Sequence, residues 1–141
     1  MLRGILLGDL GRWGEAQAFL ASTPARENWH DIHSYYLGRC YYELKNYKCA
    51  KEKLTEALDR NLPRSWENQA HYMLGLTEYR LSNVKSAKQQ FELCARTADE
   101  KYTDIANLWS WLEATSKALG QFDEADNYHR LMIDSIPKKV N

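Results

Sequence analysis

The chain has 141 residues, enough for one domain that buries about two thirds of the surface exposed by its unfolded form. Nineteen basic and nineteen acidic side chains give a formal net charge of zero, which argues against binding to nucleic acid, and no run reaches the roughly 18 apolar residues of a membrane span. The three cysteines include no C-x-x-C pair, which disfavours a disulfide framework and favours a reducing, cytoplasmic compartment.

The first predicted element is a pair of short helices within residues 1–28. A spaced pattern of small and apolar residues recurs four times along the chain, and this pair is its first copy. Aligned with the later copies, its first helix would begin before Met1, so the first copy is clipped at its start. The apolar residues 5–7 follow Arg3 and leave a signal or transit peptide open, although Asp9 interrupts them and the repeat register accounts for them. The anchors at helical spacing are Gly4, Leu7, Trp13, Ala16 and Leu20.

The second copy, residues 31–64, shows the pattern most completely. Its two apolar-periodic runs, residues 35–44 and 47–58, are separated by only two residues, which predicts an antiparallel helix pair joined by a tight turn. Gly38 lies inside the first helix, where glycine costs about 1 kcal/mol relative to alanine. We expect this glycine to let the second helix cross close by, with Ala50 as the small residue facing it.

Two further copies follow, at residues 66–101 and 104–137. The third copy repeats the glycine at Gly75, whereas the fourth has Glu113 in that place. No proline lies inside a predicted helix, which favours an all-α structure of about eight helices. The other anchors are Leu74, Ala87, Phe91 and Cys94 in the third copy, and Trp109, Leu112, Ala125 and Pro137 in the fourth.

In this register the chain resembles the tetratricopeptide repeat (TPR) family, whose pattern places Leu-Gly, an aromatic residue, two alanines and a proline at fixed offsets. The second copy matches with Leu37, Gly38, Tyr41, Ala50, Ala57 and Pro63. The resemblance implies a single TPR-like domain over residues 1–141, folded as a right-handed superhelical array of antiparallel helix pairs. The family repeat has 34 residues, but 37 separate Gly38 from Gly75 here, which lengthens helix ends or the loops between repeats.

The resemblance also implies a concave groove lined by the first helix of each pair. Aromatic side chains accumulate there, so we expect a non-enzymatic interaction module or scaffold that binds a protein or peptide with apolar or aromatic anchors. The alternative is that these tyrosines mainly pack on one another and on the outer helices. The expected groove residues are Tyr35, Tyr36, Arg39, Tyr42, Tyr72, Met73, Leu76, Tyr79, Arg80, Asn107, Trp111 and Lys117.

Three other functions are weighed against peptide binding. Family members that hold acidic chaperone tails use a clamp of lysines, asparagines and an arginine, which these groove positions lack, so chaperone-tail binding is disfavoured. Self-assembly could use uncapped terminal repeats, through Tyr128, Leu131 and the N-terminal helix. RNA binding by helical repeats is disfavoured by the neutral charge and by the alanine and aromatic anchors.

The residues with chemical reactivity do not form a recognisable catalytic site. His30, Asp31 and His33 are the only cluster of metal-ligand types at helical spacing, and no further ligands accompany them, whereas structural zinc needs four. His71 and His129 are expected to be packed and hydrogen-bonded. We therefore expect no enzyme activity, no metal and no cofactor.

Overall fold

The computed structural model describes residues 2–23, 30–60, 62–98 and 104–136. Within these ranges the regular structure consists of eight α-helices, which confirms the all-α prediction. No helix in the described ranges is long and apolar enough to cross a membrane. The helices are α1 (Leu2–Asp9), α2 (Trp13–Ser22), α3 (His30–Glu43), α4 (Tyr47–Asp59), α5 (Arg64–Arg80), α6 (Val84–Thr97), α7 (Ile105–Ala118) and α8 (Phe122–Ser135).

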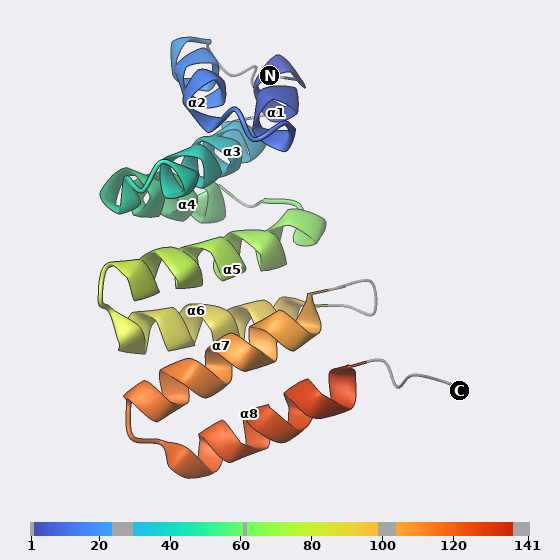
Figure 1. Ribbon diagram of the computed structural model, residues 1–141. Helices are drawn as coiled ribbons and strands as arrows, with labels where there is room; N and C mark the ends of the chain where they lie inside the picture. The colour runs from blue at the N-terminus through green and yellow to red at the C-terminus, as the bar shows by residue number, and fades with distance from the viewer. Residues whose placement is uncertain (1, 24–29, 61, 99–103, 137–141) are drawn as a thin grey trace.

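Consecutive helices form antiparallel pairs that stack on one another in chain order (Figure 1). Each first helix packs on its own second helix, and each second helix packs on the first helix of the next pair. First helices can also meet directly, as α3 and α5 do. Because contacts run mainly between neighbours along the chain, the molecule is an open solenoid whose core is distributed along its length.

The tight turn inside each helix pair has the same hydrogen-bond pattern. The amide of Asn46 donates to the carbonyl of Tyr41 at 2.8 Å, and the amide of Asn83 donates to that of Glu78 at 2.9 Å. This geometry needs one residue with positive φ, which is Lys45 at 63° in one turn and Gly120 at 75° in another. The repeated turns fix the two helices of each pair in the same relation to each other.

The helical glycines mark the closest approach within a pair, as predicted, but the residue that fills the space differs from the prediction. A Cβ atom on Gly38 would lie 2.7 Å from Cγ of Leu54, and one on Gly75 would lie 2.6 Å from Cε1 of Phe91. Ala50 was expected to face the glycine, and this expectation was wrong because a larger side chain one turn later occupies the gap. Leu54 and Phe91 are both fully buried.

The fourth pair replaces this apolar contact with a polar one. Glu113 stands at the glycine position, and its carboxylate lies 3.1 Å from Nδ1 of His129, at the position that corresponds to Leu54 and Phe91. His129 was predicted to be packed and hydrogen-bonded. The hydrogen bond is present, but the expected packing was wrong, since 49% of its side chain is exposed. No later helix in the described ranges covers α8, so this position can be polar.

Candidate protein-binding groove

Some of the expected groove residues are buried in the core, and the others lie at the surface. Tyr35 is only 2% exposed and Met73 only 9%, so the expectation that their side chains line an open groove was wrong. Both belong to the apolar cluster between the second and third helix pairs. The other expected residues are half-buried or exposed, namely Tyr36, Arg39, Tyr42, Tyr72, Leu76, Tyr79, Arg80, Asn107, Trp111 and Lys117.

Tyr35 is buried because it connects α3 to α5. Its hydroxyl donates to Oε1 of Gln69 at 3.3 Å, and its ring meets the edge of the Trp66 ring at a centroid distance of 5.6 Å. Burial raises the pKa of Tyr35 to about 12, although the nearby Arg39 guanidinium opposes this shift. The side chain therefore holds two repeats together and is not available to a partner.

Half-buried aromatic rings continue along the first helices from α3 to α7. The ring of Tyr36 contacts that of Trp66 at 5.5 Å, and the ring of Tyr79 contacts that of Trp111 at 5.1 Å. Trp111 also stacks on the buried ring of Phe91, with centroids 5.8 Å apart. We call the half-buried set the aromatic surface: Tyr36, Tyr42, Trp66, Tyr72, Tyr79 and Trp111.

Sequence reasoning missed Trp66. A usable signal was present, because Trp29 and Trp66 each lie nine residues before a helical glycine, Gly38 and Gly75 respectively. Trp29 lies outside the described residues. In the structure Trp66 contacts both Tyr35 and Tyr36 and so connects the aromatic residues of α3 to those of α5.

Tyr42 and Tyr79 occupy equivalent positions in the second and third copies, so the repeat register alone would place them next to each other along the groove. Instead the ring of Tyr42 packs on that of Tyr47 at 5.5 Å, while Tyr79 packs on Trp111. Within the described ranges no ring contact joins Tyr42 to Tyr79. Their helices α3 and α5 nevertheless contact each other directly.

The three cations expected in the groove have different surroundings. The Arg39 guanidinium lies 5.3 Å from the centre of the Trp13 ring, a cation–π distance. Lys117 pairs with Glu113 at 2.9 Å, and this hydrogen bond lowers the pKa of the Glu113 carboxyl. Arg80 is exposed, and no carboxylate in the described ranges pairs with it.

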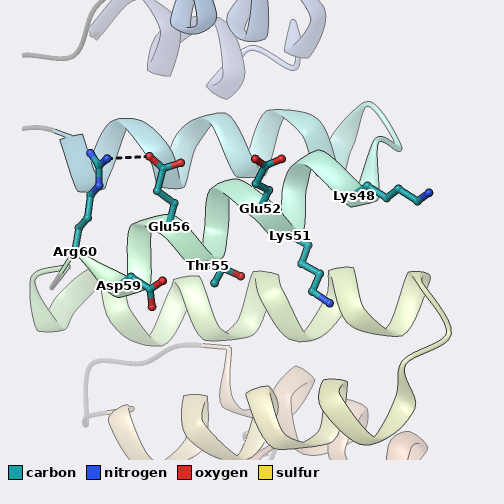
Figure 2. A pocket seen from close by; sticks show the side chains of 7 residues that line it. All are labelled: Lys48, Lys51, Glu52, Thr55, Glu56, Asp59 and Arg60. Carbon is teal, nitrogen blue, oxygen red and sulfur yellow. Dashed lines mark ion pairs between the residues drawn. The ribbon is translucent and has the colours of Figure 1, made fainter.

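A rival surface site lies on the outer side of α4 (Figure 2). Three basic and three acidic side chains line it, so its formal charge is balanced. Arg60 is paired with Glu56 at 3.0 Å, and Lys51 is paired with the buried carboxylate of Glu78 at 3.0 Å. Its lining residues are Lys48, Lys51, Glu52, Thr55, Glu56, Asp59 and Arg60, and they form a solvated ionic face with no selectivity for one charge.

The structure also describes the surroundings of a histidine and a cysteine that could in principle be reactive. His71 is packed and hydrogen-bonded as predicted, with Nδ1 at 2.8 Å from Oε1 of Gln90. Burial raises the pKa of the Cys40 thiol to about 11, which disfavours the nucleophilic thiolate. Among the described residues no group of three or more His, Cys, Asp or Glu side chains could hold a metal ion. The His30 side chain lies outside the described part.

Comparison with known proteins identifies the fold. No family model matches the chain, and no curated protein matches it in sequence. A crystal structure of MamA matches 94% of this chain and 73% of that chain, with a TM-score of 0.79 and 20% identity. The MamA 41-end structure from Desulfovibrio magneticus RS-1 matches 94% of this chain and 71% of that chain, with a TM-score of 0.78 and 17% identity. The chain therefore has the fold of a TPR-like helical solenoid.

Proposed function

We propose that this chain is a non-enzymatic protein-interaction module whose aromatic surface binds a peptide segment with apolar or aromatic anchors. The observation that carries the proposal is the run of half-buried rings contributed by α3, α5 and α7. Such rings offer apolar area together with a hydroxyl or an indole N–H, a combination that is enriched at binding hot spots.

The ring contacts also reduce the cost of binding. Tyr36 is held by Trp66, and Tyr79 is held by Trp111, so these side chains have already lost rotamer freedom before a partner arrives. Immobilising a flexible side chain at an interface costs about 0.5–1.5 kcal/mol. Rings that already pack on one another avoid part of that cost. The solenoid also presents these rings along an extended line, which suits the binding of a peptide.

The test begins with selection of peptides from a random display library on the full chain. Affinities of the selected peptides are then measured by calorimetry for the wild type and for the double variant Tyr42→Ala with Tyr79→Ala. Loss of a hot-spot ring costs about 2 kcal/mol or more, so we expect affinity to fall at least about 30-fold. The matched control is Thr55→Ala on the outer side of α4, which should bind like the wild type.

Two results would contradict this proposal. The first is an unchanged affinity in the double variant while circular dichroism shows an intact helical fold. The second is an equal loss in the Thr55→Ala control, which would place the peptide elsewhere.

A second candidate function is self-association through the two ends of the solenoid. On α8 the side chains of Phe122 and Ile133 are 64% and 53% exposed, and Leu131 is 43% exposed. At the other end, Leu10 after α1 is 71% exposed. The Tyr128 ring stacks on Trp109 at 5.9 Å, so Leu131 is the more accessible of the two expected contacts. Light scattering over a range of concentrations tests this candidate, and a monomer throughout would exclude it.

A further inference from the structure

The aromatic surface contains two pairs of a tyrosine and a tryptophan with nearly the same geometry. Tyr36 on α3 meets Trp66 on α5 at a centroid distance of 5.5 Å, with 68° between the ring planes. Tyr79 on α5 meets Trp111 on α7 at 5.1 Å, with 67° between the planes. Because the planes are steeply inclined, the two rings of each pair form the walls of an angular corner.

A buried ring lies behind the tryptophan of each corner. Trp66 also contacts the ring of Tyr35, which is 2% exposed, at 5.6 Å. Trp111 also stacks on the fully buried ring of Phe91 at 5.8 Å. The core therefore fixes one wall of each corner, while the half-buried walls keep part of their surface exposed. A ligand that binds there meets a shape that is set in advance, which reduces the cost of binding.

The positions of the two corners on α5 give their separation. Trp66 and Tyr79 are thirteen residues apart in this helix. At 1.5 Å per residue, the corners lie about 20 Å apart along its axis. At about 100° per residue, the two side chains lie on opposite flanks of the open side of α5, where exposed Gln69 and half-buried Leu76 lie between them. A ligand that reaches both corners must therefore cross this open side.

This separation favours one conformation of a bound peptide. A polyproline II helix has three residues per turn and rises 3.1 Å per residue, so residues six positions apart point the same way and lie about 19 Å apart. An α-helix would need about thirteen residues to span the corners, and isolated helices of that length are only marginally stable in water. A bound β-strand pairs with the edge of a sheet, whereas the regular structure in the described ranges is helical.

Proline combines this conformation with an apolar ring. The pyrrolidine ring fixes φ near −65°, so a proline-rich segment already adopts polyproline II before it binds. The conformational entropy lost on binding is therefore small. Grooves lined by aromatic side chains bind such segments, because the flat proline ring packs against aromatic faces and the solvated peptide backbone needs no partner strand.

We propose that the ligand of the aromatic surface is a proline-rich segment in the polyproline II conformation, with two prolines six positions apart that occupy the two corners. This inference rests on the proposed function, because it names the class of peptide that the aromatic surface binds. Tyr36 and Trp66 receive one proline, and Tyr79 and Trp111 receive the other. The segment crosses the open side of α5 between them.

The first test titrates oligoproline into the full chain. A probe of about ten residues is long enough to span both corners. NMR follows the tryptophan indole N–H signals, and we expect saturable shifts at Trp66 and Trp111. Trp109 is the internal control, because it is also half-buried but stacks on Tyr128 with only 19° between the planes, so this pair forms no corner. Shifts that do not saturate, or that are equally large at Trp109, would overturn the inference.

The spacing is tested with two peptides of identical composition that carry their prolines six and four positions apart. Residues four positions apart in polyproline II point about 120° away from each other, so only the first peptide can present both prolines to the corners. We expect calorimetry to show at least tenfold tighter binding of the first peptide. Equal affinities would contradict the geometry of two corners.

Matched tyrosine variants remove one ring from each kind of pair. Tyr36→Leu and Tyr79→Leu each take one wall from a corner and should weaken oligoproline binding at least tenfold, the loss of a hot-spot ring. Tyr128→Leu takes a tyrosine from the stacked pair with Trp109 and should change binding less than twofold. Circular dichroism checks the fold of each variant, and the indole shifts of the wild type decide the case if a variant loses helix. An equal loss in Tyr128→Leu would overturn the inference.

Selected peptides separate this inference from the proposed function. If peptides from the display library lose affinity in the double variant Tyr42→Ala with Tyr79→Ala but oligoproline does not displace them, the proline assignment is wrong and the groove stands. If neither library peptides nor oligoproline bind, both proposals fail. We expect the selected peptides to be enriched in prolines six positions apart and to be displaced by oligoproline.

Discussion

Replacing Gly75 by alanine tests the packing of the solenoid most sharply, because two opposing effects can be separated. An alanine inside a helix is favoured over glycine by about 1 kcal/mol. At Gly75, however, the new Cβ would lie 2.6 Å from Cε1 and 2.7 Å from Cδ1 of the Phe91 ring. That ring is fully buried and stacks on Trp111, so it cannot move aside without disturbing the next repeat.

Overpacking of this kind costs about 1–3 kcal/mol, and the helix gain of about 1 kcal/mol offsets part of it, so we predict that Gly75→Ala lowers the free energy of unfolding by up to about 2 kcal/mol. Urea unfolding followed by circular dichroism measures the change. Gly14→Ala is the matched control, because nothing lies within 4 Å of its Cβ position and the change should be neutral or stabilising. A Gly75→Ala variant that gained as much stability as Gly14→Ala would refute the close-packing argument.

The double variant Gly75→Ala with Phe91→Leu checks the cause of the loss. A leucine is shorter than the phenylalanine ring and leaves room for the added methyl group. The two losses should therefore not add, and the coupling free energy should be at least about 0.5 kcal/mol. Additive losses would mean that the methyl group disturbs something other than Phe91.

Three further predictions concern charge and ionisation. Buried Glu78 accepts from Nδ2 of Asn83 at 2.8 Å, so Glu78→Ala should cost about 1–3 kcal/mol in urea unfolding, and Glu78→Gln should cost less. The pKa of Tyr35 is raised from 10.0 to about 12, so unfolded chains lose this proton first and stability falls as pH rises through that interval. Alkaline unfolding of Tyr35→Phe should show a shallower fall. The hydrogen bond from Lys117 lowers the pKa of Glu113 below 4.5, so its stabilisation is present above that pH and is lost in acid. Glu113→Gln should remove that part of the acid dependence.

The helical pattern could be predicted because it depends on local spacing. Apolar residues at helical intervals, a two-residue turn and glycines in register specify antiparallel pairs, and the structure contains them. The residue that fills the space beside each glycine could not be predicted in the same way. Whether Ala50 or Leu54 faces Gly38 depends on how the two helices cross, and this is decided by packing across the whole pair.

The surface residues were harder to predict than the core anchors. Tyr35 and Tyr36 are adjacent in sequence, yet the first is buried and the second is half-buried. The difference arises because Tyr35 points into the apolar cluster between the second and third helix pairs, where it also hydrogen-bonds Gln69, and contacts between repeats are invisible in the spacing of one helix. The pairing of Tyr42 with Tyr47 was missed for a related reason, since it crosses the turn between two helices.

The central claim, that a peptide lies on the aromatic surface, can be tested by photocrosslinking. The photoreactive residue p-benzoylphenylalanine replaces Tyr79, which keeps an aromatic ring at that position, and in a second protein it replaces Thr55 on the outer side of α4. Each protein is irradiated with a peptide selected on the wild type, and the products are mapped by mass spectrometry. We predict crosslinks from position 79 and none from position 55. Crosslinks from position 55 alone would contradict the account.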